Sequence, residues 1–262
     1  MLKSLNTAAT GMAAQQENID TIANNLANVS TTGFKRARAE FEDLIYQTLR
    51  EPGSASGANS VSPTGVQTGM GVRTASTQKD FDMGSAVMTK APLDVQIEGL
   101  GFFQIQTPDG QIAYTRDGSF KKDPNGKIID KNGNSLIPEI TIPPNATGLE
   151  ITPEGQVRVL VGGNDREPQV VGQIDVASFI NPTGLKSMGR NLFAQTPASG
   201  QPVTSRPGTS GTGYLSQGQL EASNVNIVDE MVNMISAQRA YETNSKVIQT
   251  SDQMLQAVTN LR

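Results

Sequence analysis

Hydrophobic residues recur at helical spacing at both ends of the chain, whereas the middle alternates short apolar runs with turn residues. Near the N-terminus the apolar positions are separated alternately by three and four residues, with one interruption at Gln15. They are Leu5, Ala8, Met12, Ile19, Ile22, Leu26 and Val29. Because this alternation is the heptad pattern of a coiled-coil seam, it predicts a helix over residues 2–29 that stops at the following Ser-Thr-Thr-Gly sequence.

This N-terminal helix has a low intrinsic stability. Residues 2–29 include five asparagines, three threonines and Gly11. Each of these residues costs roughly 0.5–1 kcal/mol relative to alanine inside a helix. We therefore expect the segment to become helical only when it packs against partners.

The C-terminal segment repeats the heptad pattern. Asn226 is a suitable N-cap residue, and residues 224–262 contain neither Gly nor Pro. The apolar stripe consists of Ile227, Met231, Met234, Tyr241, Ile248 and Leu255, widened by Val228, Ile235 and Val258. We predict a helical arm over residues 223–262 that packs with an N-terminal arm over residues 1–33.

The two apolar stripes leave two arrangements open, because a helix cannot bury a stripe against itself. The arms could pack only on each other as an intramolecular coiled coil, or on each other and also on neighbouring copies. The low propensity of the N-terminal arm favours the second arrangement. The residues expected at the assembly interface are Leu5, Met12, Ile19, Ile22, Leu26, Val29, Ile227, Met231, Ile235, Tyr241, Ile248 and Leu255.

The segment between the arms predicts an extended connector and a β domain. Residues 51–71 are rich in Gly, Ser, Pro and Thr, which is typical of a connector, and we place it at residues 34–71. From residue 72 to residue 222, short apolar runs are bounded by turn sequences. These include Asp109-Gly110, Asp117-Gly118, Asn125-Gly126, Asn132-Gly133 and Glu154-Gly155. Asp-Gly and Asn-Gly pairs supply the positive φ of tight hairpins, so we predict an antiparallel, hairpin-rich β domain between two α-helices that form a coiled-coil-like pair.

Composition removes most of the usual catalytic chemistry. The 262 residues contain no Cys and no His, so the chain lacks thiolate nucleophiles, imidazole bases, and the metal ligands that both residues supply. Carboxylates are scattered and no pair stands out, so we predict no catalytic residue, no cofactor and no metal site. The net charge of −4 and the lack of a basic patch argue against a nucleic-acid partner.

Two turn sequences resemble ligand-binding motifs only in part. Asp130, Asn132 and Asn134 occupy the first, third and fifth positions of a calcium loop, but Ser135 stands where the loop needs Gly and Thr141 where it needs Glu. We therefore interpret this sequence as a hairpin turn. The Gly99-Leu100-Gly101 sequence lacks the third Gly of a dinucleotide fingerprint and precedes a predicted strand rather than a helix.

The chain shows no signal for the membrane. It contains no run of 18 or more apolar residues, so we expect no direct membrane insertion. Its first residues lack the charged region and apolar run of a secretory signal peptide.

Long motifs at both ends resemble those of the bacterial flagellar rod and hook axial proteins. The first motif is Ala23-Asn24-Asn25-Leu26-Ala27-Asn28-Val29-Ser30-Thr31-Thr32-Gly33-Phe34-Lys35, and the second runs from Glu221 through Asn226 and Met231 to Glu242. The middle motifs Gly99 to Phe103 and Tyr114 to Phe120 are similar to the long rod and hook members. The connector, with Ile45 to Arg50 and Gly69 to Arg73, most resembles the distal rod members.

The resemblance implies a structural subunit that polymerises helically into a hollow rod and transmits torque to the hook. In that family the paired terminal helices line the tube. The implied partners are further copies of the chain, proximal rod subunits, hook subunits, the bushing ring proteins and the flagellar type III export apparatus. The implied location is the periplasm-spanning rod of the basal body, reached without a cleaved signal peptide.

Three alternatives stay open at this point. The chain could be another axial member, either a proximal rod or a hook subunit. It could also be a secreted coiled-coil protein with a β head, which predicts no ordered polymer. An enzyme that uses carboxylates of the β domain is the third, and it predicts a turnover that is lost when one Asp or Glu is changed.

Overall fold

A computed structural model describes residues 2–53, 55–57, 60–61, 63–161 and 168–260. Residues 54, 58–59 and 62 of the predicted connector and residues 261–262 of the predicted C-terminal arm lie outside this range. The chain forms two compact units. Unit 1 comprises Met1–Ala27, Ala37–Lys79 and Asn226–Arg262, and unit 2 comprises Asn28–Arg36 and Asp80–Val225.

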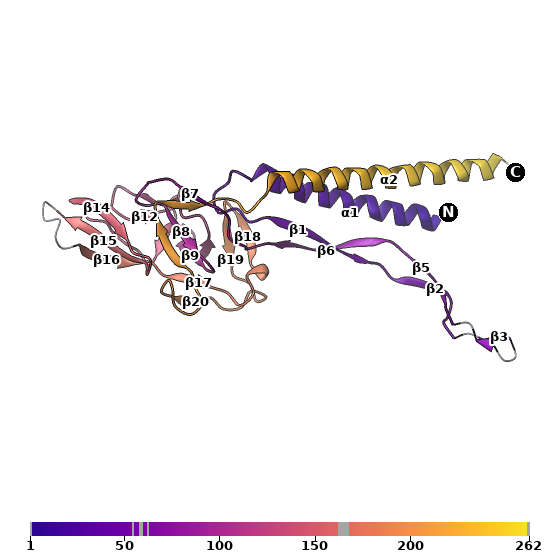
Figure 1. Ribbon diagram of the computed structural model, residues 1–262, viewed down its shortest axis with the longest axis horizontal. Helices are drawn as coiled ribbons and strands as arrows, with labels where there is room; N and C mark the ends of the chain where they lie inside the picture. Colours follow the sequence, from indigo (N-terminus) through magenta and orange to yellow (C-terminus); the bar gives the residue numbers. More distant parts are fainter. Residues whose placement is uncertain (1, 54, 58–59, 62, 162–167, 261–262) are drawn as a thin grey trace. The chain divides into compact units, whose positions relative to one another are not determined.

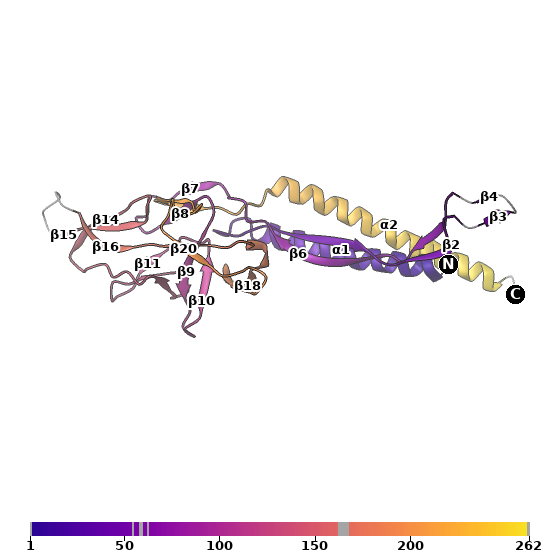
Figure 2. The ribbon, with the colours of Figure 1, turned by 90° about the horizontal axis from the view of Figure 1, so that it is seen from below.

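Unit 1 is a pair of long helices with a strand ribbon beside them. Helices α1 (Leu2–Ala27) and α2 (Ile227–Asn260) lie side by side and run antiparallel (Figure 1). The view from below shows the ribbon of β1 (Ala37–Asp43) and β6 (Val72–Lys79) along α1 (Figure 2). The predicted pairing of two terminal helices is confirmed. No helix among the described residues has the length and hydrophobicity of a membrane-spanning segment.

The two helices differ in how well the sequence places their ends. Helix α1 stops at Ala27, so the predicted end at Val29 is wrong. The reason is a turn in which the Thr31 N–H donates to the Asn28 carbonyl at 3.1 Å. Helix α2 begins as predicted, because Asn226 Oδ1 accepts from the Val228 N–H at 3.1 Å and so caps the helix.

The predicted connector is extended, but much of it is paired. After β1, the chain forms strands β2 (Tyr46–Arg50), β3 (Ala55–Gly57), β4 (Ser60–Val61) and β5 (Val66–Gly69) before it reaches β6. The antiparallel pairs are β1 with β6, β2 with β5, and β3 with β4. The connector is therefore a long, two-stranded antiparallel ribbon whose second half pairs with its first half.

Unit 2 is the predicted β domain, built from short antiparallel strands. Its largest sheet has the order β11-β12-β13-β9-β10-β19-β18, with β17 beside β9 and β20 beside β17. A second sheet has the order β14-β15-β16, and two further pairs join β21 to β8 and β22 to β7. The strand bounds are β7 Ala86–Met88, β8 Val95–Glu98, β9 Phe102–Gln106, β10 Ile112–Thr115, β11 Lys121–Lys122, β12 Ile128–Ile129, β13 Ser135–Ile137, β14 Ala146–Ile151, β15 Gln156–Val161, β16 Gln169–Gln173, β17 Val176–Ser178, β18 Lys186–Gly189, β19 Leu192–Ala194, β20 Val203–Ser205, β21 Tyr214–Gln217 and β22 Gln219–Glu221; a short 3₁₀ helix spans Pro182–Gly184.

The core of unit 2 lies on the two faces of β9. Phe103 and Ile105 point into a large aliphatic cluster and are 0% exposed. Phe102 points into a smaller aromatic cluster with Tyr114 and Phe179, where the rings meet edge to face. Since β9 buries Phe102 on one face and Phe103 and Ile105 on the other, its sequence does not alternate strictly between apolar and polar residues.

Most of the predicted hairpin turns are confirmed. Gly110, Gly126, Gly133 and Gly155 all adopt positive φ and close turns by donating their N–H to the residue three positions earlier. The prediction is wrong at Gly118, which is not among the glycines with positive φ. This glycine is required by close packing instead, because a Cβ there would lie 1.7 Å from the Val95 carbonyl oxygen.

The sequence that partly resembles a calcium loop is a hairpin turn, as predicted. Asp130 Oδ1 accepts from the backbone N–H groups of Asn132 and Asn134, at 2.7 and 2.9 Å. Its Oδ2 accepts from the two asparagine side chains. All the acceptor positions of the Asp130 carboxylate are thus engaged in holding the turn.

Candidate functional site

The contact between α1 and α2 is a narrow heptad seam made largely of small residues. On α2 the most buried positions are Glu230, Ala237 and Ser251, which fall on one seven-residue repeat with Asn244. Opposite Asn244, a Cβ at Gly11 would lie 3.0 Å from the Asn244 amide nitrogen, so the helices approach closely there. The seam is therefore coiled-coil-like in period, although Gly and Ala occupy several of its α1 positions.

Asn25 ties the end of α1 to both of its neighbours in unit 1. Its side-chain oxygen accepts from the Ala37 N–H at 2.9 Å, and its amide nitrogen donates to the Ala37 carbonyl at 2.8 Å. The same nitrogen donates to Glu230 Oε2 on α2 at 3.2 Å. Asn25 is 1% exposed. Its amide satisfies the backbone N–H and carbonyl of Ala37, at the start of β1, as a neighbouring strand would do.

The structure separates the predicted interface residues into four groups. Those of α1 are half-buried or buried in unit 1, namely Leu5, Met12, Ile19, Ile22 and Leu26. Three residues of α2 lie four positions after the seam residues Ala237, Asn244 and Ser251, namely Tyr241, Ile248 and Leu255, of which Tyr241 is 37% exposed. Val29 belongs to unit 2 and lines a groove there with Val87 and Leu220. The remaining three, Ile227, Met231 and Ile235, are 46%, 52% and 48% exposed.

Together with Val228 and Val232, these three exposed residues form a surface that we call the outer stripe of α2. Val228 and Val232 are 68% and 57% exposed. On a helix of 3.6 residues per turn, Val228, Val232 and Ile235 lie on the side opposite the seam of Glu230 and Ala237, and Ile227 and Met231 form the edge of the outer stripe nearer the seam. Such positions are polar in a coiled coil whose outside faces water, so the outer stripe indicates a further packing partner.

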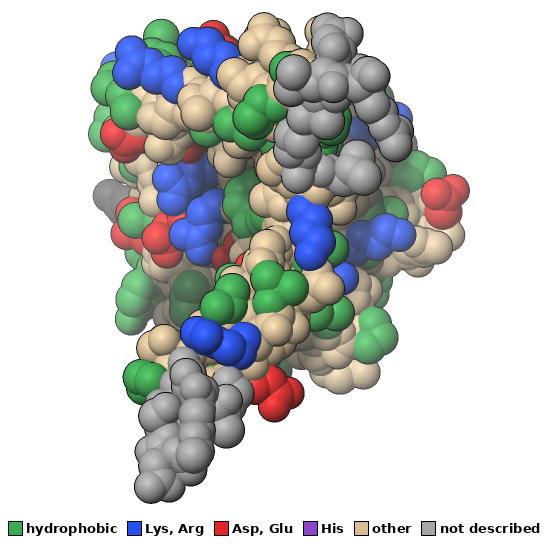
Figure 3. Space-filling model, turned by 90° about the vertical axis from the view of Figure 1, so that its right-hand side faces the viewer, with side chains coloured by type: hydrophobic (Ala, Val, Ile, Leu, Met, Phe, Trp, Pro, Cys, Tyr) green, Lys and Arg blue, Asp and Glu red, His purple; other side chains and the backbone are tan. Residues whose placement is uncertain are grey.

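The hairpin of β2 and β5 leaves a second apolar surface exposed in unit 1. Ile45, Tyr46, Leu49 and Val66 are between 44% and 85% exposed. The view in Figure 3 shows hydrophobic side chains exposed among polar and charged ones on one side of the molecule. Since an isolated two-stranded hairpin is marginally stable in water, these side chains also indicate a partner.

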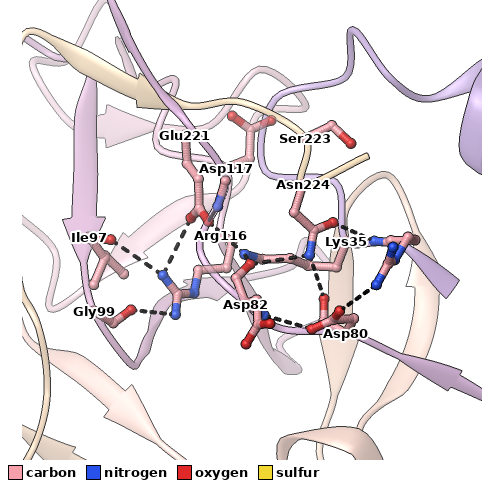
Figure 4. A network of polar contacts seen from close by, with 12 residues as sticks. Lys35, Asp80, Asp82, Ile97, Gly99, Arg116, Asp117, Glu221, Ser223 and Asn224 are labelled. Carbon is pink, nitrogen blue, oxygen red and sulfur yellow. Dashed lines mark hydrogen bonds and ion pairs between the residues drawn. The ribbon is translucent and has the colours of Figure 1, made fainter. Parts of the chain in front are cut away.

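Unit 2 contains a buried charge cluster formed by Lys35, Arg116 and Glu221 (Figure 4). Lys35 Nζ lies 2.6 Å from Glu221 Oε1, and Arg116 Nη1 lies 3.3 Å from Glu221 Oε2. The side chains are 0%, 2% and 0% exposed, in the order Lys35, Arg116, Glu221. One carboxylate therefore serves two buried cations.

Backbone groups supply further hydrogen bonds to the charge cluster, although the buried Arg116 Nε has no hydrogen-bond partner. Arg116 Nη2 donates to the Gly99 carbonyl at 2.7 Å, and Lys35 Nζ donates to the Asp82 carbonyl at 2.7 Å. The Gly84 N–H donates to Glu221 Oε1 at 2.9 Å. The carbonyls of Gly99 and Asp82 are neutral acceptors, so they stabilise the two cations without cancelling the excess positive charge.

The charge cluster joins the chain segment that follows α1 to the segment that precedes α2. The Gly33 N–H donates to the Glu221 carbonyl at 2.8 Å. The Arg36 N–H donates to Asn224 Oδ1 at 2.7 Å, and Asn224 Nδ2 donates to the Asp80 carbonyl at 2.9 Å. Segments 33–36 and 221–224 are thus bound to each other within unit 2, and Figure 4 shows Asn224 close to Lys35 and Asp80.

Burial lowers the pKa of the Lys35 ammonium below its ordinary value, the Glu221 carboxylate opposes that change, and the Arg116 guanidinium adds to it. Burial also lowers the pKa of Arg116, again against the attraction of Glu221. Both shifts follow from two cations sharing one carboxylate away from water.

The lowered pKa of Lys35 predicts that the protein gains stability as the pH rises through the folded pKa toward the unfolded one. Between the folded pKa and the unfolded value of about 10.4, the unfolded chain holds a proton that the folded chain has released. The gain is at most about 1.4 kcal/mol per pH unit for one proton. The free energy of unfolding, measured with urea between pH 7 and about 9.5, should rise less with pH for Lys35→Met than for the unmodified chain.

A comparison of slopes is needed because burial also lowers the pKa of Lys79, which is retained in both proteins. The scan ends below pH 10 because burial raises the pKa of Tyr114, which acts in the opposite direction at higher pH. Equal slopes for the two proteins would show that Lys35 titrates normally.

The charge cluster was not predicted from the sequence. Lys35 and Glu221 are 186 residues apart, and Arg116 and Glu221 are 105 apart, so no local spacing connects them. One signal was present, because each of the three residues lies within one of the motifs that resemble the axial proteins.

Comparison with known proteins supports the same three regions. Residues 5–35 match the family described as flagella basal body rod protein, residues 96–159 the flagellar hook protein FlgE/F/G D1 domain, and residues 216–261 the flagellar basal body rod FlgEFG protein C-terminal family. Lys35, Arg116 and Glu221 fall in one matched region each.

Several curated proteins are similar over the whole chain. The flagellar basal-body rod protein FlgG of Buchnera aphidicola subsp. Acyrthosiphon pisum is 52% identical over 261 residues, which cover 100% of both chains. FlgG of Borreliella burgdorferi is 51% identical over 264 residues, covering 100% of this chain and 99% of the relative. FlgG of Bacillus subtilis is 38% identical over 267 residues, again covering 100% of both.

Proposed function

Because the chain belongs to the family of the flagellar basal-body rod protein FlgG, we propose that it is a structural subunit of the distal rod of the bacterial flagellum. In this role, copies of the chain polymerise helically into a hollow shaft that transmits torque to the hook. The observation that carries the proposal is the similarity to FlgG proteins along the full length of the chain. The terminal helix pair and the β domain agree with it.

The apolar surfaces of unit 1 support a role in assembly. The outer stripe of α2 and the hairpin residues Ile45 and Leu49 are exposed in a single copy, although burying each such side chain is favourable by about 1.5–3 kcal/mol. A polymer offers neighbouring copies to cover them. We propose that the predicted interface residues act at two levels, with those on the seam joining α1 to α2 and Ile227, Met231 and Ile235 joining copies.

We propose that the role is structural rather than catalytic. The chain has neither His nor Cys. Lys35 and Arg116, whose pKa values burial lowers, are both held in ion pairs with Glu221 and are almost fully shielded from solvent. Perturbed ionisable groups of this kind serve structure when no substrate can reach them.

The family assignment supports a proposal about the partners and the location. We propose that the chain contacts proximal rod subunits at one end of its polymer and hook subunits at the other. The bushing ring proteins surround the polymer where it crosses the periplasm. We further propose that the flagellar type III apparatus exports the chain without a cleaved signal peptide.

Electron microscopy of basal bodies tests the proposed function. A strain that lacks this gene should form a short rod without its distal segment and outer rings, and a plasmid copy should restore the full length. A complete rod that lacks only the hook would assign the chain to the hook instead. Intact basal bodies would overturn the flagellar assignment and favour a secreted coiled-coil protein.

A further inference from the structure

The outer stripe of α2 continues into a charged region on the same side of the helix. Val228, Val232, Ile235 and Arg239 are separated by four, three and four residues, so they lie in one line. Arg239 is exposed, and its side chain takes part in none of the ion pairs found among the described residues. This line therefore presents branched apolar side chains that end in a positive charge.

Helix α1 presents a complementary surface on its own exposed side, which we call the outer face of α1. Its members are also separated alternately by four and three residues, and all are exposed; they are Ala9, Ala13, Gln16, Asp20, Ala23 and Ala27. Four of the six are alanine, so few side-chain atoms project from this surface. Asp20 supplies a negative charge, and within the chain it accepts a hydrogen bond from the neighbouring Gln16 side chain at 3.1 Å.

The charged residues of α1 near this surface are acidic. The helix contains Glu17 and Asp20, and its one basic residue, Lys3, lies near the opposite end. The outer face of α1 thus matches the outer stripe of α2 in two respects. Alanines leave room for Val232 and Ile235, and Asp20 carries the opposite charge to Arg239.

We propose that the outer stripe of α2 in one copy packs on the outer face of α1 in a second copy, with Arg239 paired to Asp20. This inference rests on the proposed function, since it names the contact by which unit 1 polymerises. The two surfaces differ, so the contact is heterologous and leaves a free stripe and a free face at the two ends of every assembly. Repetition of such a contact generates an open helical polymer rather than a closed dimer.

The register within one copy sets the geometry of this contact. Gly11 lies opposite Asn244, and counting five residues inward along each helix places Gln16 level with Arg239. Asp20 is four residues further along α1, about one helical turn or 5.4 Å. A second copy that points in the same direction and is displaced by about one turn therefore brings Arg239 level with Asp20 and Val232 level with Ala27.

Charge reversal tests the ion pair directly in the intact chain. Asp20→Arg and Arg239→Asp, each expressed as the sole copy, should reduce the fraction of basal bodies with full-length rods at least tenfold. The double variant restores opposite charges and should return to at least half of the original fraction. Helicity of the purified single variants, measured by circular dichroism, should be unchanged because both side chains are exposed. Single variants that assemble normally, or a double variant no better than the singles, would overturn the proposal.

Disulfide crosslinking tests the apolar part of the proposed contact. Only introduced cysteines can react, because the chain has no cysteine of its own. After oxidation, purified rods of the Ala27→Cys, Val232→Cys variant should give a ladder of covalent oligomers on a non-reducing gel. A disulfide needs Cα atoms within about 7 Å, so the two positions, on opposite sides of one helix pair, cannot be bridged within a copy. The matched control is Ala27→Cys with Val247→Cys, since Val247 is 40% exposed but lies off the outer stripe. The control variant should stay monomeric on the gel. A ladder from the control variant alone would overturn the proposal.

These outcomes separate the inference from the proposed function. If the unmodified chain fails to restore rods in the deletion strain, the proposed function is wrong. If it restores rods while all charge variants assemble equally and the cysteine pair gives no ladder, the polymer exists but uses a different contact.

Discussion

Replacing Glu221 by glutamine should lower the free energy of unfolding by about 3–5 kcal/mol. Glutamine keeps the size of the side chain and an oxygen that can accept from the Gly84 N–H. What it removes is the single negative charge between the two buried cations, Lys35 and Arg116. Two like charges would then remain buried without an opposite charge. Urea unfolding followed by circular dichroism gives the change, and hydrogen exchange in β9 locates it in unit 2.

Two matched variants show whether charge is the cause. Glu98→Gln makes the same chemical change at an exposed position of β8 and should alter stability by less than about 0.5 kcal/mol. Lys35→Met removes the excess cation and leaves Arg116 paired with Glu221, so it should cost less than half as much as Glu221→Gln. A triple variant with Met at positions 35 and 116 and Leu at position 221 should recover most of the loss. A Glu221→Gln protein that unfolds at the same urea concentration as the original would contradict this account.

Replacing Phe103 by alanine should cost about 3–5 kcal/mol, chiefly through the cavity that it leaves. Phe103 is 0% exposed and meets Phe120 edge to face, with 5.1 Å between ring centroids. It lies in β9, which pairs with β10, β13 and β17 at the centre of the largest sheet. The rigid strands around it cannot collapse into the vacated volume. Thermal or urea unfolding measures the loss.

Leu100→Ala is the control for Phe103→Ala. Leu100 precedes the same strand but is 63% exposed, so its truncation should change stability by less than about 0.5 kcal/mol. The m-value should be unchanged in both variants if the folded unit keeps its surface. Comparable losses for the two variants would mean that the aliphatic cluster does not carry the stability of unit 2.

The sequence alone determined the features that depend on near neighbours. Heptad spacing predicted both helices, and Asn226 was recognised as the cap of α2 because a cap needs only the next two or three residues. Asn-Gly and Asp-Gly pairs placed most hairpin turns for the same reason. Gly118 shows the limit of that reasoning. Its sequence predicted a tight turn, but the glycine is required because the Val95 carbonyl, distant in sequence, approaches it.

The tertiary structure decided which residues meet across long separations and which faces stay uncovered. Lys35, Arg116 and Glu221 come together because the strands of unit 2 close around them, and no periodicity encodes that closure. Helix α2 carries apolar residues on more than one side, so its sequence could not say which side α1 would cover. The small residues of α1, with Gly11 against Asn244, place the seam at Glu230 and Ala237, and so leave Val228 and Ile235 outside. Helix period is a local property of the chain, whereas the choice of buried face depends on the shape of the partner.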